Sequence, residues 1–127
     1  EEVERVLRPG GAFVFTDPMQ SDEADPAALA PVLERLDLDS LASPAFYRGI
    51  ANRLELEERS FEDLSAHLTR HYGRVLDVLN QNEAEGRRVS GEEYVDRMKR
   101  GLENWVDAGR AGALVWGIFH FRKGERL

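Results

Sequence analysis

The side chains of this chain that could do chemistry are few, and two of them are histidines on one helical face. His67 and His71 lie four residues apart in a segment with helical periodicity. This spacing is typical of the start of a zinc-binding helix, but Thr69 and Arg70 lie between the histidines, with no Glu general base, and the arginine repels a cation. We therefore expect no metal site here. His71 also flanks the apolar stripe of its helix, which fits either a partly buried core histidine or a pocket residue.

Four aromatic residues could enclose an alkylated ammonium group, because the faces of aromatic rings attract cations. They are Tyr47, Tyr72, Trp105 and Trp116. Aromatic residues at these spacings also serve simply as core, so the pattern leaves both interpretations open. The sequence has no Gly-x-Ser-x-Gly nucleophile elbow and no Gly-x-Gly of a nucleotide-binding loop.

The composition narrows the classes of function. The chain has 127 residues and no cysteine, which excludes disulfides, thiolate chemistry and cysteine-ligated metals. Its 17 basic and 24 acidic residues give a net charge of −7, which argues against nucleic acid as a partner. No apolar run approaches the roughly 20 residues of a membrane span. We expect a cytoplasmic protein, and we interpret the uncapped helical pattern at Glu1 as part of a longer chain.

The stretch from Val6 to Pro18 organises the elements that must position these side chains. Pro9-Gly10-Gly11 ends a helix, and the apolar run 12–15 predicts a strand covered on both faces. Asp17-Pro18 is expected to end that strand. A helix that leads into a buried strand is typical of a parallel α/β sheet, in which ligands bind beyond the carboxyl ends of the strands. The candidates at this end are Thr16, Asp17, Pro18 and Met19.

Capping signals and periodicity predict the remaining elements. Asp25-Pro26 and Ser43-Pro44 each begin a helix; Pro31 delays or kinks the first, and the second ends near residue 52. The charged segment 54–62 predicts an edge strand, and the apolar segment 113–121 predicts a central one. Periodicity predicts a helix over 64–82, and a capping box at Ser90 predicts another over 90–109, after a polar break at 83–89. The prediction is an α/β fold with three strands (12–17, 54–62, 113–121) and about five helices.

Several of these segments resemble a known family. The run from Glu2 to Asp17, with its Leu-Arg-Pro-Gly-Gly turn, resembles the segment entering the fifth strand of class I S-adenosylmethionine-dependent methyltransferases. Asp17-Pro18-Met19, His71-Tyr72 and the segment from Met98 to Gly117 resemble sarcosine/dimethylglycine N-methyltransferases, which make glycine betaine.

The resemblance implies that residues 1–127 form the C-terminal half of a Rossmann-like class I methyltransferase domain. An antiparallel seventh strand would lie between strands five and six, and the helices at about 26–52 would cover the substrate. S-adenosylmethionine would be the co-substrate, and the partner would be a small-molecule amine. The glycine-rich loop and the ribose-binding acidic residue of the N-terminal half have no counterpart here. This chain alone is therefore expected to be inactive, and its cofactor-binding residues are not assigned.

The resemblance also implies a set of substrate-binding residues, which are Met19, His71, Tyr72 and Trp116. Arg48, Arg70 or His71 could hold the substrate carboxylate. No catalytic residue is assigned, because a tertiary amine loses no proton when it is methylated. Two alternatives remain open: a methyltransferase for another small acceptor, such as phosphoethanolamine or a quinone ring, and a non-enzymatic acidic α/β interaction module.

Overall fold

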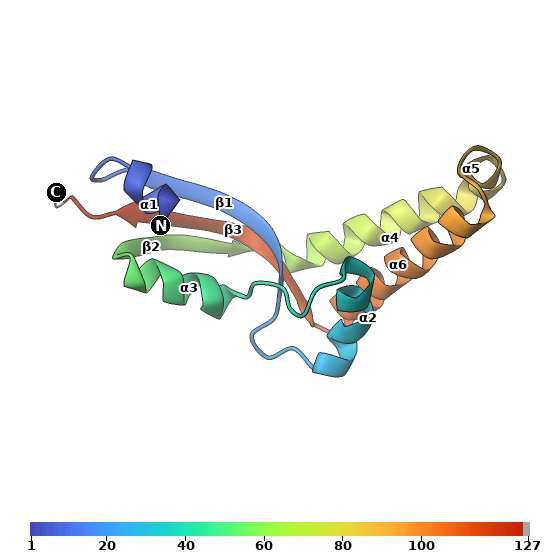
Figure 1. Cartoon of the computed structure of the whole chain (residues 1–127), viewed down its shortest axis with the longest axis horizontal. Helices are drawn as coiled ribbons and strands as arrows, with labels where there is room; N and C mark the ends of the chain where they lie inside the picture. Colours follow the sequence, from blue (N-terminus) through green and yellow to red (C-terminus); the bar gives the residue numbers. More distant parts are fainter. Residues whose placement is uncertain (126–127) are drawn as a thin grey trace.

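The structure, a computed structural model, describes residues 1–125. A three-stranded sheet forms one end of the elongated molecule, and a helical arm made of α4, α5 and α6 forms the other (Figure 1). In chain order the elements are α1 (Glu2–Val6), β1 (Ala12–Gln20), α2 (Pro26–Leu36), α3 (Pro44–Arg53), β2 (Leu56–Asp63), α4 (Ser65–Gln81), α5 (Glu83–Ser90), α6 (Glu92–Arg110) and β3 (Leu114–Lys123).

The last strand lies in the middle of the sheet. The strand order is β1-β3-β2, and β3 pairs antiparallel with both neighbours. Phe119 lies opposite Phe15 on one side and Phe61 on the other. Because both edge strands run opposite to β3, they run in the same direction as each other. Three expectations are confirmed. The strand β3 is central, the charged β2 lies at an edge, and an antiparallel strand lies between two others.

Two expectations for β1 are wrong. The strand does not end at Asp17-Pro18 but continues to Gln20, with Pro18 opposite Trp116. Proline is tolerated because β1 lies at an edge of the sheet formed by residues 1–125, and an edge strand leaves alternate N–H groups without a ladder partner. Nor is β1 covered on both faces: Val14 is 58% exposed. Within residues 1–125 this strand pairs only with antiparallel β3, so the expected parallel neighbour is absent from that part of the chain.

Both predicted Xaa-Pro helix starts are confirmed. The Asp25 Oδ1 accepts a hydrogen bond from the Ala27 N–H at 3.0 Å, and the Ser43 Oγ accepts one from the Phe46 N–H at 3.1 Å. These bonds satisfy donors that have no partner within the first turn of a helix. The helix α2 begins at Pro26 and runs through Pro31.

The predicted break at 83–89 and the capping box at Ser90 are wrong. Residues Glu83–Ser90 form a helix, α5, that was not expected, and Ser90 is the last residue of this helix. The N-cap of α6 is Gly91, at φ 89°, and no side chain caps that helix. The guanidinium of Arg87 explains the difference, because it pairs with Glu83 one turn earlier and with Asp96 of α6. These ion pairs stabilise a short polar helix that has little apolar surface of its own.

The two serines give a matched test of capping. Ser43→Ala is expected to lower the free energy of unfolding by about 1 kcal/mol, because the Phe46 N–H loses its acceptor. Ser90→Ala should leave stability unchanged, since its side chain caps no helix. Denaturant unfolding of both variants measures the difference. Equal losses for the two would contradict the assigned start of α6.

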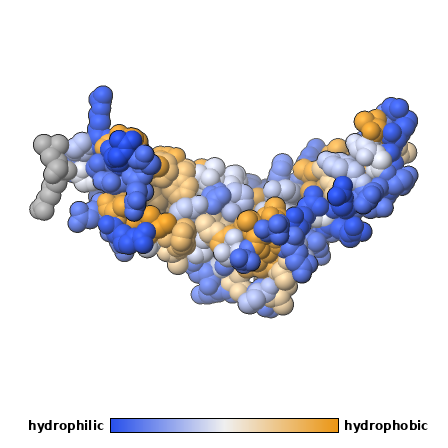
Figure 2. Space-filling model, viewed as in Figure 1, coloured by the Kyte–Doolittle hydropathy of each residue, from blue (hydrophilic) through white to orange (hydrophobic). Residues whose placement is uncertain are grey.

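The apolar core consists of two clusters. The helix cluster, where α2, α4 and α6 meet the start of β3, contains Leu29, Val32, Leu68, Ala108, Ala113 and Leu114. The sheet cluster lies between α3 and one face of the sheet and contains Met19, Ala51, Leu56, Phe119 and Phe121. Further apolar residues are exposed, and Figure 2 shows apolar patches at both ends of the molecule and around α2. None of the helices in residues 1–125 is both long and apolar enough to cross a membrane.

Candidate functional site

Three aromatic side chains from three different elements pack against the helix cluster. They are Tyr72 of α4, Trp105 of α6 and Trp116 of β3, and each is partly buried. The rings of Tyr72 and Trp105 lie 4.8 Å apart between centroids and are inclined by 34°. Two of the predicted site residues, Tyr72 and Trp116, therefore belong to one aromatic group together with Trp105.

The backbone of Trp116 is fixed at the junction between the sheet and α4. Its N–H donates to the Ser65 Oγ at 3.1 Å, and its carbonyl accepts from the Leu64 N–H at 2.7 Å. These two bonds tie the beginning of α4 to the beginning of β3. The aromatic group is thus held by rigid elements, as a binding site requires.

His71 lies at the solvent side of this group. Its ring is 5.2 Å from that of Tyr72 in an edge-on arrangement, and the residue is exposed. Of the two alternatives for His71, its exposure excludes the partly buried core histidine. His67 is exposed as well, and its Nδ1 lies 3.3 Å from the Arg70 Nη1. In residues 1–125 no group of three or more His, Cys, Asp or Glu side chains could hold a metal ion.

Met19 lies apart from the other predicted site residues. It is fully buried, and it belongs to the sheet cluster together with Val115. The register explains why: Pro18 lies opposite Trp116 and Met19 opposite Val115. Successive side chains of a strand point to opposite faces, so Met19 and Trp116 face opposite sides of the sheet. The structure does not bring Met19 together with Tyr72 and Trp116.

Tyr47 is also outside the aromatic group, so the structure does not support a cage of all four aromatic residues. Its hydroxyl donates a hydrogen bond to the Asp17 Oδ2 at 2.6 Å, and its ring packs edge-on against Phe15 at 4.9 Å and Phe119 at 5.9 Å. Burial, and then the hydrogen bond and negative charge of Asp17, raise the pKa of Tyr47 to about 12. Sequence reasoning missed this pair, since no pattern connects residues 30 positions apart.

The Asp17–Tyr47 pair predicts a stability change at high pH. A phenol with a raised pKa in the folded state stabilises that state fully below its ordinary pKa of 10. This contribution is lost as the pH rises from 10 towards 12, because the unfolded chain releases the proton first. Tyr47→Phe should therefore be less stable than the wild type below pH 10, and the difference should shrink above it. Urea unfolding of both proteins between pH 8 and 11.5 measures this; a constant difference would contradict the hydrogen bond.

The three proposed carboxylate anchors differ in their surroundings. Arg48 is engaged already: its Nε lies 2.8 Å from the Glu58 Oε1, and its guanidinium lies over the rings of Phe61 and Phe119 at 5.4 and 5.5 Å. His71 lies on α4 beside Tyr72. Arg70 is two residues before Tyr72, so the two side chains do not share a face of the helix, and Arg70 lines a groove with Arg74 and Arg110 instead. Neither Arg70 nor His71 forms a salt bridge with a carboxylate of residues 1–125.

The glycines of the turn Pro9-Gly10-Gly11 are required by the conformation of the backbone. Gly10 has φ 77°, and a Cβ at Gly11 would lie 2.8 Å from the Arg8 carbonyl oxygen. The turn precedes β1, whereas a nucleotide-binding glycine loop follows a strand and opens a helix. These residues do not fit the nucleotide part of S-adenosylmethionine, and no step involving that part is assigned to them.

Comparison with known proteins shows close relatives along nearly the whole chain, although no family model matches. The chain is 57% identical over 122 residues to the glycine/sarcosine/dimethylglycine N-methyltransferase of Actinopolyspora halophila, covering 96% of this chain and 22% of that protein. It is 48% identical over 123 residues to the sarcosine/dimethylglycine N-methyltransferase of Halorhodospira halochloris, covering 97% of this chain and 44% of that protein. The chain is homologous to part of the sarcosine/dimethylglycine N-methyltransferases.

The solved structures agree with this relationship. A crystal structure from Galdieria sulphuraria, assigned as a sarcosine dimethylglycine methyltransferase, matches with a TM-score of 0.87 and 36% identity, covering 99% of this chain and 46% of that one. The Mycobacterium tuberculosis cyclopropane synthase MmaA2 matches with a TM-score of 0.81 at 13% identity, which shows a shared fold alone. The chain spans less than half the length of these sarcosine/dimethylglycine methyltransferases. The α/β fold predicted from class I methyltransferases is confirmed.

Proposed function

We propose that the protein to which this chain belongs transfers methyl groups from S-adenosylmethionine to sarcosine and dimethylglycine and so forms glycine betaine. The observation that carries this proposal is identity of 57% and 48% to enzymes of that name over 96–97% of the chain. Since glycine betaine would be the product, we further propose an osmoprotective role in the cytoplasm. The same identity argues against an acidic interaction module without activity.

The last methylation, that of dimethylglycine, needs no proton transfer once its nitrogen is in the free-amine form. The lone pair of dimethylglycine nitrogen attacks the sulfonium methyl in line, the carbon–sulfur bond breaks, and its electron pair stays on sulfur. Positive charge moves from sulfur to the nitrogen, which has no proton to lose. Proximity and alignment therefore supply much of the rate enhancement, and a general base is not required for this step.

The aromatic group suits the acceptor in this scheme. A ring face stabilises a quaternary ammonium as its charge develops. The rings of Tyr72 and Trp105 lie together, and Trp116 packs against the same helix cluster. Arg70 and His71, on the same helix as Tyr72, would supply a cation or hydrogen-bond donor for the carboxylate. We propose His71, Tyr72 and Trp116 as acceptor-site residues. Met19 would contribute by packing in the sheet cluster, on the opposite face of the sheet.

The deciding experiment is a methyl-transfer assay of the full-length protein. S-adenosylmethionine is offered with sarcosine, dimethylglycine or phosphoethanolamine, and methylated products are identified by mass spectrometry. We expect methylation of sarcosine and dimethylglycine and none of phosphoethanolamine. Methylation of phosphoethanolamine alone would favour another acceptor on the same fold, a fold shared with the phosphoethanolamine N-methyltransferase 2 of Haemonchus contortus at 13% identity. No methylation of any acceptor would overturn the proposal.

A further inference from the structure

The basic side chains of residues 1–125 divide into two equal sets. Eight of them form a salt bridge with a carboxylate, and these are Arg5, Arg48, Arg59, Arg87, Arg88, Lys99, Arg122 and Lys123. The other eight of that region are arginines without such a partner. Six of those eight line two surface grooves, three in each: Arg35, Arg97 and Arg100 in one, and Arg70, Arg74 and Arg110 in the other.

The first of these, here called the α2–α6 groove, lies between the C-terminal half of α2 and the middle of α6. Its volume is about 730 Å³, within the range of ordinary small-molecule sites. Its three arginines are accompanied by one acidic residue, Glu34, so its formal charge is +2. The chain as a whole has a net charge of −7, so this positive groove is a local feature and not part of a generally basic surface.

Arg35 of α2 reaches across this groove to α6, where Gly101 has no side chain and leaves room for its guanidinium. Its Nη1 donates to the Arg97 carbonyl oxygen at 2.9 Å. Its guanidinium lies against Gly101, where a Cβ would be 2.3 Å from the Arg35 Cζ. A glycine inside a helix is unfavourable compared with alanine, so its presence in the middle of α6 needs a packing reason. Gly101 supplies the space that directs the Arg35 charge into the groove.

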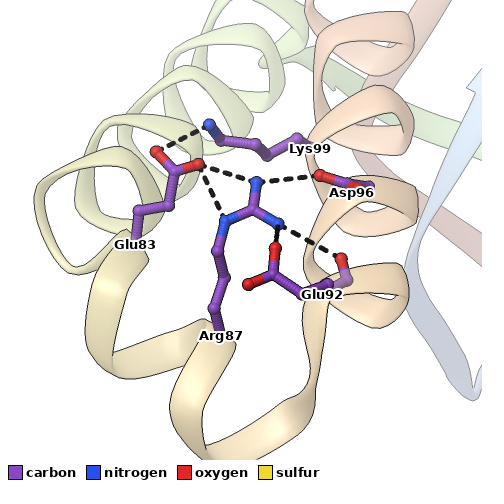
Figure 3. Close-up of polar contacts among 5 residues, drawn as sticks. All are labelled: Glu83, Arg87, Glu92, Asp96 and Lys99. Carbon is purple, nitrogen blue, oxygen red and sulfur yellow. Dashed lines mark hydrogen bonds and ion pairs between the residues drawn. The ribbon is translucent and has the colours of Figure 1, made fainter.

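The arrangement differs from a charge network that serves packing alone. At the tip of the helical arm, Arg87 pairs with carboxylates of Glu83, Glu92 and Asp96, and Lys99 pairs with Glu83 (Figure 3). In that network both cations are paired with carboxylates of the same network. The arginines of the α2–α6 groove repel one another instead, and within residues 1–125 no salt bridge relieves that repulsion.

We propose that the α2–α6 groove binds a compact multivalent oxyanion, a phosphate or a carboxylate compound. Guanidinium groups are planar forks of donors that match both kinds of oxyanion with paired hydrogen bonds. Arg97 and Arg100 would contact the anion from α6, and Arg35 would do so from α2. The groove is separate from the aromatic group, so this site does not depend on the proposed methyl transfer.

Calorimetric titration of the full-length protein with tripolyphosphate and with citrate, at low salt, tests the proposal. We expect one site for at least one of the two probes, and the stronger probe identifies the ligand as phosphate or carboxylate. Replacing both Arg97 and Arg100 by glutamine should raise the Kd of the stronger probe about tenfold or more, because two charge-assisted contacts are lost. The matched control is Arg74→Gln/Arg110→Gln in the second groove, which should leave this Kd unchanged. No measurable binding, or equal weakening by both double variants, would overturn the proposal.

Gly101→Ala adds a test with two opposite expectations. Alanine favours the helix, and the three atoms nearest to its Cβ belong to the flexible end of Arg35, which can move away. The melting temperature should therefore stay the same or rise, while oxyanion binding weakens several-fold because Arg35 is displaced. A variant that binds the anion as tightly as the wild type would contradict the role of Arg35. A lowered melting temperature with unchanged affinity would contradict it equally.

Discussion

Phe119→Ala is expected to lower the free energy of unfolding by about 3–5 kcal/mol, the usual cost of removing a large buried ring. Phe119 has no exposed surface and lies at the centre of the sheet cluster. Its ring stacks on Phe61 at 4.4 Å, Phe121 at 5.3 Å and Phe15 at 5.4 Å. Removing the ring would leave a cavity in contact with all three strands, since the neighbouring rings come from β1, β2 and β3.

Phe46 of α3 gives the matched control, because it is 57% exposed. Phe46→Ala should change stability by about 0.5 kcal/mol or less, as is usual for surface substitutions. Urea unfolding of the two variants against the wild type measures both values. A loss below 1 kcal/mol for Phe119→Ala would mean that the sheet cluster is not the core of this end of the molecule.

Tyr72→Leu is expected to reduce kcat/KM for dimethylglycine by roughly threefold to thirtyfold in the full-length protein. The reduction follows from the loss of a cation–π contribution of about 0.5–2 kcal/mol to the forming ammonium. Tyr72→Phe keeps the ring face and should retain most of the activity. This expectation rests on the proposed methyl transfer, and steady-state kinetics with both variants measure it.

Stability measurements on the same variants separate a binding role of Tyr72 from a packing role. The ring lies against Trp105 and the helix cluster, so leucine could weaken the junction of α4 and α6. If packing is its only role, Tyr72→Leu should melt earlier while each folded molecule stays fully active. That outcome would remove Tyr72 from the acceptor site, and His71 would lose its main support as a site residue.

Local signals in the sequence were enough to predict several elements. Asp25 and Ser43 cap their helices through bonds to residues two and three positions ahead, which a linear pattern can reveal. The apolar segment of β3 was recognisable as central because side chains on both of its faces are apolar. The family resemblance added the antiparallel direction of β3, which periodicity does not specify.

The errors arise where distant residues decide the structure. The helix α5 depends on the contact between Arg87 and Asp96, and Asp96 belongs to the next helix. The separation of Met19 from Trp116 follows from the strand register, which could not be read before the pairing of β1 with β3 was known. The hydrogen bond between Asp17 and Tyr47 likewise joins a strand to a later helix. Each of these features is a tertiary contact without a local signature.

The central position of β3 has a consequence for the order of folding during synthesis. Within residues 1–125, β1 and β2 do not pair with each other, and each pairs with residues 114–123. A ribosome must therefore complete β3 before either of these two antiparallel ladders can form. Until then Phe15 and Phe61 lack the Phe119 ring on which they stack, whereas α4 and α6 are close in sequence and can pair earlier. These two rings therefore stay without that partner from the emergence of β2 to that of β3, and chaperone binding in that interval would favour the native sheet.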